Sequence, residues 1–282
     1  MISRLHSLIS RRLRVAAVAA LCGVLAACAS DPGIHADTLA AQGRLQHEQI
    51  KAGRFVLTAY TRISKPGQLL TIYIEGDGLA WRGRGRPSDD PTPRKAVGLQ
   101  LAAADTGANV AYVARPCQYT PMSANAACTP EYWTGKRYAP EVVDAMNVAV
   151  SRLKARAPGS RLRLVGYSGG GAIAVLLAAR RADVAEVRTV AGNLGVEEVN
   201  RIHGVTPMPE SLDPYDVASR LVRIPQLHLS GADDSVVPTA VARRFAAAAG
   251  PCARVQVQPG LSHEGDWAAI WPAALAQPAG CR

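Results

Sequence analysis

Aromatic residues and lysine are scarce in this 282-residue chain. Phe, Trp and Tyr together make up 5% of it, and 27 Arg stand against 5 Lys. No run of five or more like charges occurs, and no basic stripe is interleaved with aromatic residues. The formal net charge of +10 therefore reflects an arginine-rich composition and does not indicate a nucleic-acid partner. Almost half of the residues, 48%, are apolar, which is enough for the core of one large α/β domain.

The chain also lacks the motifs of common metalloenzymes. It contains no His-Glu-x-x-His, and no cluster of Cys and His has the spacing of metal ligands. No internal repeat is present. The sequence therefore implies neither a metal nor an organic cofactor.

The first 27 residues have the pattern of a signal peptide. Four arginines come before residue 15, and residues 15–27 form an apolar stretch too short to span a bilayer. The stretch leads into the tetrapeptide LAAC at 25–28, which resembles a bacterial lipobox, whose cysteine becomes the first mature residue and carries the lipid. We therefore expect Cys28 to be the lipid attachment site. Ala29 follows it where Asp would favour the inner membrane, so the resemblance implies anchoring at the outer membrane, facing the periplasm.

Three segments follow from this interpretation. Residues 1–27 are the signal peptide, residues 28–52 are a polar tether without clear periodicity, and residues 53–282 are the folded domain. Nothing in the sequence indicates the oligomeric state.

The cysteine count agrees with an exported chain. Four cysteines remain beyond the lipobox, and an even number in an oxidising compartment predicts two disulfides among three possible pairings. We favour Cys117 with Cys128, which closes a short loop, and Cys252 with Cys281, which ties down the C-terminus.

From residue 55 onward, strand and helix patterns alternate. Strands are expected at 55–60, 69–74, 109–114, 161–165, 187–190, 224–229 and 254–257, and helices at 93–105, 140–156, 170–181, 239–249 and 265–276. Residues 195–220 show no regular period. Such alternation predicts an α/β fold, with a mostly parallel central sheet and helices on both faces.

One turn in this pattern carries a candidate nucleophile. Gly166-Tyr167-Ser168-Gly169-Gly170 matches G-x-S-x-G and lies between an apolar strand and an Ala-rich helix, the context that gives the motif meaning. We expect the turn to raise Ser168 above the sheet edge, beside a helix N-terminus that favours negative charge. The backbone N–H of Gly169 would then donate to a developing oxyanion. The alternative is a glycine-rich turn in which the serine only caps the helix.

A serine nucleophile needs a base, and the best-placed of six histidines is His263. It lies in a loop directly after the last strand, where its imidazole can reach back over the sheet edge. The loop after the 224–229 strand offers Asp233 and Asp234 as the acid that orients the base. The order Ser, Asp, His is that of one known serine-hydrolase arrangement.

At this point the sequence resembles the α/β-hydrolase family, over roughly residues 55–278. Many members have an acid loop G-x-x-D-x-x-V-P; aligning Gly231 and Pro238 selects Asp234, while a slip of one residue selects Asp233. Members often have His-Gly-x-Gly after an early strand, with x as a second oxyanion donor. The resemblance places Asp77 there, although Glu75 stands where His is common.

The resemblance implies a serine hydrolase that cleaves an ester or related acyl bond of a small-molecule substrate. Amidase, peptidase and thioesterase chemistry use the same parts. The loops at 81–90, 115–138 and 195–220 would cover the site. The alternative is a lipid-anchored binding protein built on a hydrolase scaffold, with an unused triad.

Overall fold

A computed structural model describes residues 31–83 and 85–281. Its main sheet has eight strands in the order β1-β2-β6-β3-β7-β8-β9-β10. β1 and β2 pair antiparallel, as do β2 and β6, and the pairs from β6 through β10 are parallel. The strands are β1 (Gln46–Ala52), β2 (Phe55–Ile63), β3 (Leu70–Ile74), β6 (Asn109–Val113), β7 (Leu162–Tyr167), β8 (Val184–Val190), β9 (Gln226–Gly231) and β10 (Ala253–Gln258).

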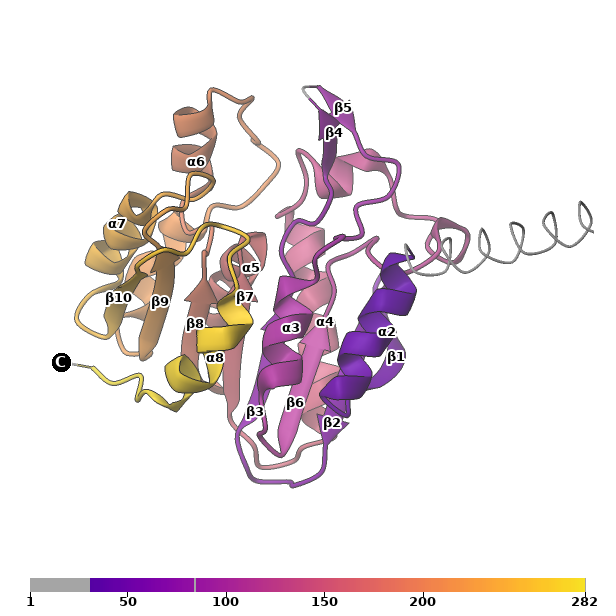
Figure 1. The fold of residues 1–282 in the computed structure, drawn as a ribbon, viewed down its shortest axis with the longest axis horizontal. Helices are drawn as coiled ribbons and strands as arrows, with labels where there is room; N and C mark the ends of the chain where they lie inside the picture. The colour runs from indigo at the N-terminus through magenta and orange to yellow at the C-terminus, as the bar shows by residue number, and fades with distance from the viewer. Residues whose placement is uncertain (1–30, 84, 282) are drawn as a thin grey trace, which may run out of the picture.

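Helices cover both faces of this sheet, as expected for an α/β fold (Figure 1). One face carries α2 (Pro32–Gln42), α3 (Val97–Ala104) and α8 (Trp267–Ala276), and the other carries α4 (Pro140–Ala155), α5 (Gly169–Ala178), α7 (Thr239–Ala249) and the 3₁₀ helix η3 (Pro214–Leu221). Two hydrophobic clusters fill the space between the layers. In β3, Ile72 and Ile74 belong to one cluster and Tyr73 to the other, because successive side chains of a strand point to opposite faces.

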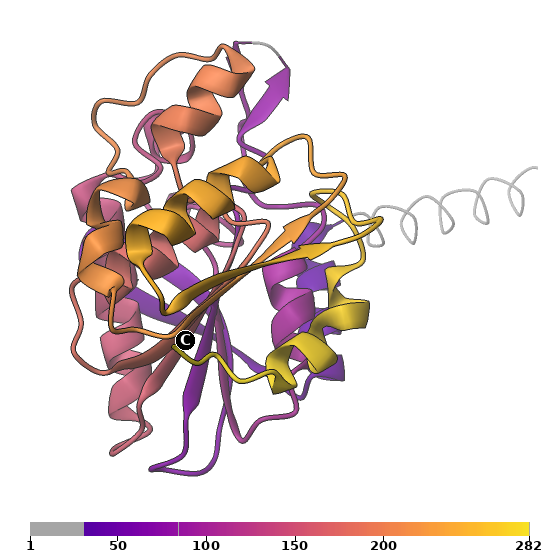
Figure 2. The same cartoon turned by 90° about the vertical axis from the view of Figure 1, so that its left-hand side faces the viewer.

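Two smaller elements stand above the carboxyl ends of the parallel strands. They are the helix α6 (Val196–His203) and the hairpin of β4 (Trp81–Gly83) and β5 (Arg86–Pro87), which flank the same edge of the sheet (Figures 1 and 2). Short 3₁₀ turns η1 (Met122–Ala124) and η2 (Pro130–Trp133) lie in the loop after β6. None of the helices in the described ranges is long and apolar enough to cross a membrane.

The expected tether is wrong for the part that the structure describes. Residues 32–42 form α2 and residues 46–52 form β1, which pairs with β2 over its whole length. Asp31 caps α2 by accepting a hydrogen bond from Gly33 N–H, and the helix buries Ala36 and Ala40 against the sheet. The folded domain therefore begins at least twenty residues before the expected boundary at residue 53.

Both favoured cysteine pairs are joined in the structure. Cys117 and Cys128 form a disulfide with 5.6 Å between their Cα atoms, and Cys252 is bonded to Cys281. The first disulfide closes the loop that contains Gln118. The proposed lipid attachment residue, Cys28, lies outside the described residues.

Candidate active site

Ser168 lies at the sharp turn between β7 and α5. Its φ of 49° and ψ of −121° are unusual for a residue with a side chain, and its backbone is held in place from both directions. Ser168 N–H donates to Val190 O (2.9 Å), and Asn193 N–H donates to Ser168 O (2.9 Å). A side chain at Gly166 would overlap the backbone of the following helix, so glycine is required there. The turn presents the Ser168 hydroxyl at the carboxyl edge of the sheet.

His263 reaches this hydroxyl from the loop between β10 and α8. Its Nε2 lies 2.9 Å from Ser168 Oγ, and its Nδ1 lies 2.9 Å from Asp234 Oδ2. The backbone carbonyl of His263 accepts hydrogen bonds from Tyr167 Oη (3.2 Å) and Trp267 Nε1 (2.9 Å). These bonds hold the loop over the end of β7. The structure therefore brings together three predicted residues that are 29 and 95 positions apart in sequence.

The structure separates the two candidate acids. Asp234 is buried, and its Oδ1 accepts hydrogen bonds from the N–H groups of Val236 (2.9 Å) and Val237 (2.8 Å), which leaves Oδ2 directed at His263. Asp233 is exposed, and its backbone N–H donates to Leu261 O (3.0 Å). Asp234 is therefore the acid that contacts the imidazole.

The loop after β3 lies against the nucleophile turn. A side chain at Gly76 would come within 3.2 Å of the Ser168 Cβ atom, and Asp77 lies directly against Gly169. Gly169 is the first residue of α5, so its N–H has no acceptor within the helix. Within the described part of the chain, the backbone N–H of Asp77 has no acceptor either. The two predicted oxyanion donors thus lie next to each other beside Ser168.

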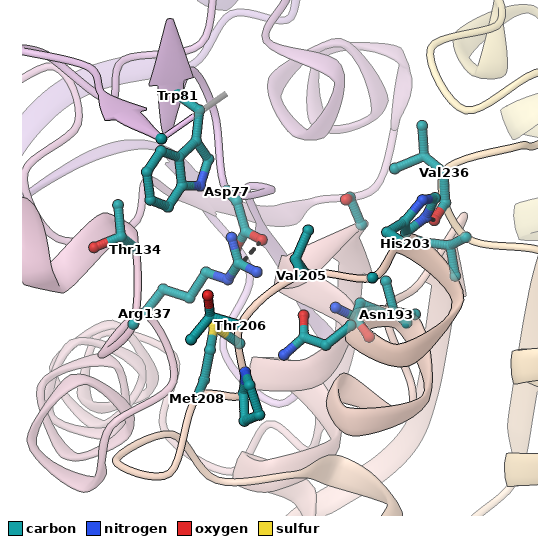
Figure 3. Close-up of a pocket in the computed structure, with 18 of the residues that line it drawn as sticks. Asp77, Trp81, Thr134, Arg137, Asn193, His203, Val205, Thr206, Met208 and Val236 are labelled. Carbon is teal, nitrogen blue, oxygen red and sulfur yellow. Dashed lines mark hydrogen bonds and ion pairs between the residues drawn. The ribbon is translucent and has the colours of Figure 1, made fainter. Parts of the chain in front are cut away.

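The negative charge of the Asp77 carboxylate is offset by two arginine side chains and a tyrosine hydroxyl. Arg115 Nη1 donates to Oδ1 (3.1 Å), Tyr138 Oη donates to Oδ2 (2.7 Å), and Arg137 Nε lies 3.5 Å from Oδ2 (Figure 3). Burial is the largest single influence on the pKa of Arg137 and lowers it, but Asp77 and Tyr138 together outweigh burial, so the pKa is raised overall. Because the carboxylate is paired with two guanidinium groups, its charge is offset beside the two predicted oxyanion donors.

Glu75 has a structural role that explains its departure from the family pattern. Its buried carboxylate accepts hydrogen bonds from the N–H groups of Gly76 (2.9 Å), Gly98 (3.1 Å) and Leu99 (3.4 Å) and from Tyr112 Oη (3.0 Å). Burial raises the pKa of Glu75, and these four donors oppose that shift. The side chain therefore fastens the loop after β3, which contains Asp77, to the N-terminal turn of α3, which has no capping side chain of its own.

The loop closed by the first disulfide supports the same segment. Gln118 Nε2 donates to Gly76 O (3.0 Å), and Gln118 Oε1 accepts from Arg115 N–H (3.1 Å). Arg115 in turn holds Asp77. The disulfide at Cys117 is thus next in sequence to Gln118, whose side chain helps to hold the loop that contains Gly76 and Asp77.

No protein-family model and no curated protein matches this sequence. Solved structures match its fold. An alpha-beta serine hydrolase homologue from Coxiella burnetii aligns over 82% of this chain and 97% of its own, with a TM-score of 0.56 and 16% sequence identity. The chain has the α/β-hydrolase fold.

Other solved structures with this fold differ in size. The esterase domain of a Rhodothermus marinus protein aligns over 82% of this chain and 94% of its own, with a TM-score of 0.55 and 15% identity. An acylaminoacyl peptidase from Pyrococcus horikoshii aligns over 78% of this chain but 37% of its own, with a TM-score of 0.55 and 13% identity. In each case the similarity to this chain is in the α/β-hydrolase fold.

Two cavities of this α/β-hydrolase fold meet at Ser168. The larger cavity, of about 680 Å³, extends towards α6, and the smaller cavity, of about 490 Å³, extends towards the His263 loop. Both are lined by Asp77, Trp81, Arg137, Ser168 and Val236. The three loops expected to cover the site contribute to the larger cavity, for example through Trp81, Thr134 and Val205 (Figure 3). The nucleophile is therefore reached from two sides.

Several residues of the site were not predicted from the sequence. Arg115, Arg137 and Tyr138 surround Asp77, and Asn193 and Asn200 line the larger cavity. All but Asn193 lie in the segments 115–138 and 195–220 that were expected to cover the site, with Asn200 in α6, but no short motif singles them out individually. Among the described residues, no group of three or more His, Cys, Asp or Glu is placed to hold a metal ion.

Proposed function

We propose that this protein is a serine hydrolase that cleaves a carboxylic ester through an acyl-enzyme intermediate. The observation that carries the proposal is the continuous hydrogen-bonded relay from Ser168 Oγ through His263 to Asp234, with both contacts at 2.9 Å. A hydroxyl becomes an effective nucleophile when an adjacent base takes its proton, and a buried carboxylate stabilises the resulting imidazolium.

The reaction uses these groups in two steps. Ser168 Oγ attacks the substrate carbonyl carbon while its proton passes to His263 Nε2. The N–H groups of Asp77 and Gly169 stabilise the oxyanion that forms. His263 then gives the proton to the leaving oxygen as the carbonyl–oxygen bond breaks, which leaves the acyl group on Ser168. Water attacks this ester with His263 again as base, and the acid product leaves.

The proposed role of His263 indicates which part of the substrate each cavity holds. The leaving group must lie next to the imidazole that protonates it, and His263 lines the smaller cavity only. We therefore assign the smaller cavity to the leaving group and the larger cavity to the acyl group. Arg94, Lys95 and Glu264 are exposed at the smaller cavity, so its mouth is open to solvent and carries charges of both signs.

We propose an ester as the cleaved bond because the chain aligns with nearly the whole length of a solved esterase domain. The chain aligns with 94% of a solved esterase domain, whereas it aligns with 37% of the acylaminoacyl peptidase. Fold similarity alone does not decide the bond, so amides and thioesters belong in the same substrate panel.

We also propose that the enzyme is exported and anchored by lipid at Cys28, at the outer membrane facing the periplasm. The two disulfides support an oxidising compartment. Mass spectrometry of the membrane-extracted protein should find an acylated Cys28 as the first residue. A mature chain that begins elsewhere without acyl mass would contradict this assignment.

The proposed activity can be tested with a panel of 1-naphthyl esters of increasing acyl length. We expect the wild-type protein to hydrolyse part of the panel and Ser168→Ala to lose at least about 10⁴-fold in kcat/KM, since the triad acts as a unit. Ser160→Ala is the matched control, because Ser160 lies just before β7, at the end of the strand opposite to the carboxyl edge, and its hydroxyl makes no hydrogen bond to the described residues. If Ser168→Ala keeps the activity of the wild type, the assignment is wrong; if no ester, amide or thioester is cleaved, the alternative of a binding protein is favoured.

A further inference from the structure

Two buried amide side chains line the larger cavity without hydrogen-bond partners. Asn193 follows β8 and Asn200 lies in α6; they are 5% and 4% exposed. Asn193 Oδ1 and Asn200 Nδ2 are fully buried and have no partner in the described part of the chain. The other amide atom of each side chain forms no hydrogen bond with those residues either. Two carboxamides therefore face the cavity with their hydrogen-bonding capacity unused.

Other buried asparagines of the chain show what is normal here. Asn125 is 2% exposed, and its amide accepts from Val56 N–H (3.3 Å) and donates to Val56 O (2.9 Å). Asn109 accepts from two backbone N–H groups and donates to two carbonyls. Leaving a buried polar group unpaired costs about 1–3 kcal/mol. The unpaired amides of Asn193 and Asn200 thus lower the stability of the fold, and a ligand that hydrogen-bonds to them would offset this loss.

Their position connects them to the acyl side of the reaction. Asn193 N–H holds Ser168 O at 2.9 Å, so Asn193 is next to the nucleophile turn. Figure 3 shows Asn193 at the cavity below His203 and Val236, with Arg137 and Trp81 across from it. The remaining wall contains many apolar residues, including Val199, Val205, Pro207, Met208 and Val237.

The cavity lining also indicates that the missing partner is uncharged. Its charged residues with described side chains, Asp77 and Arg137, pair with each other at 3.5 Å. His203 Nε2 is engaged with Val236 O at 2.7 Å. Each carboxamide offers both a donor and an acceptor, so the pair is suited to a neutral group that also donates and accepts.

We propose that Asn193 and Asn200 recognise a hydroxyl group on the acyl part of the substrate, close to the reacting carbonyl. The inference rests on the proposed function, which places the acyl group in this cavity. The preferred acyl group then has an apolar body of limited size and one neutral polar substituent near its carbonyl end. A plain alkyl chain of the same length leaves both amides unpaired in the complex and loses that interaction.

Matched ester pairs test this specificity. We would measure kcat/KM for 1-naphthyl butyrate and for its 2-hydroxy and 3-hydroxy counterparts, corrected for spontaneous hydrolysis. At least one hydroxyacyl ester should be preferred by roughly 10-fold or more, since one or two hydrogen bonds are gained. Hydrolysis that depends on Ser168 but shows no preference at either position would overturn the inference and leave the proposed function standing. Absence of any hydrolysis would overturn both.

Substitutions to a similar volume show whether the two amides cause the preference. In Asn193→Leu and Asn200→Leu the ratio should fall towards 1, because turnover of the hydroxyacyl ester falls more than turnover of the butyrate. The melting temperature should be unchanged or higher, because an unpaired polar group is removed. Asn125→Leu is the matched control and should lower the melting temperature, because its amide is paired. If the preference survives both cavity substitutions, or if these variants melt as early as Asn125→Leu, the amides are structural and the proposal is wrong.

Discussion

The two sides of Ser168 differ in how their buried polar groups are satisfied. On the side of His263 and Asp234, each polar atom of the relay has a partner at 2.8–2.9 Å. On the side of α6, Asn193 and Asn200 bury amide atoms without a partner among the described residues. The first side is complete before any substrate arrives, and the second side is not.

This difference separates reactivity from recognition. A relay whose groups are already oriented requires little reorganisation during the reaction, which is where preorganised sites gain their rate. Unpaired groups in a cavity contribute to recognition instead, because they gain hydrogen bonds only when a complementary ligand binds. The substitutions below first test His263 and Asp234 on the paired side. They then test Asp77, which is paired with two arginines, and His228, which has one ring nitrogen without a partner in the described part of the chain.

The largest effect is expected at the base. His263→Ala should reduce kcat/KM by about 10⁴-fold or more, because the proton of Ser168 then has no acceptor. His35→Ala, an exposed histidine of α2, is the control and should behave as the wild type. Steady-state kinetics on one cleaved ester give the comparison. If His263→Ala keeps wild-type turnover, the histidine is not the base.

The acid loop should show an unequal response to two adjacent substitutions. Asp234→Asn should lower kcat by roughly 10⁴-fold, the magnitude known for the corresponding change in another serine-hydrolase triad, because the amide no longer stabilises the imidazolium. Asp233→Asn should cost less than 10-fold, roughly, since Asp233 is exposed and does not contact the imidazole. The reverse ranking of the two kcat values would move the role to Asp233.

Asp77 tests whether the oxyanion loop works through its backbone. Asp77→Asn removes the charge that offsets Arg115 and Arg137 but keeps the N–H group. The free energy of unfolding should fall by about 1–3 kcal/mol, because the guanidinium groups lose their anionic hydrogen-bond partner in a mostly buried site. Denaturant unfolding and kcat are measured on the same preparation. A loss of kcat beyond roughly 10-fold, with unchanged stability, would show that the carboxylate itself takes part in the reaction.

His228 provides an unpaired group that no ligand can reach. It is fully buried in β9, its Nδ1 lies 2.9 Å from Thr189 Oγ1, and its Nε2 has no partner among the described residues. Burial lowers the pKa of His228 from 6.5 to about 3, so the unfolded chain takes up a proton first as the pH falls. Stability due to this group is therefore lost progressively between about pH 6.5 and pH 3.

The expected slope is up to about 1.4 kcal/mol per pH unit, the value for one proton. Urea unfolding of the wild type and His228→Gln at pH 6.5 and 5.0 isolates it, because other titrating groups are common to both proteins. The wild type should lose more stability than the variant over this interval. Equal losses would mean that His228 takes up its proton over the same pH range in the folded and unfolded states, which would contradict the lowered pKa.

Much of the fold and the relay could be predicted because their signals are local. The helix at Thr239–Ala249 was predicted to the residue, and the turn at Ser168 is encoded by glycines that its close backbone contacts require. His263 and Asp234 were found because parallel strands bring their carboxyl ends to one edge.

The segments that were missed lack such signals. β1 is an edge strand with four exposed or half-buried polar residues at its start, and α2 buries only the small side chains of Ala36 and Ala40. α6 has eight residues, too few for a repeated apolar pattern. Asn193 and Asn200 are brought to the larger cavity by this helix and the loop before it, so their role depends on tertiary structure.

The central claim is that Ser168 is an activated nucleophile, and a fluorophosphonate probe tests it most directly. The wild-type protein should be labelled rapidly, and peptide mass spectrometry should place the phosphonyl group on Ser168. Heat-denatured protein and Ser168→Ala should remain unlabelled, and His263→Ala should react far more slowly. An unlabelled native protein, or a label found on another residue, would contradict the account.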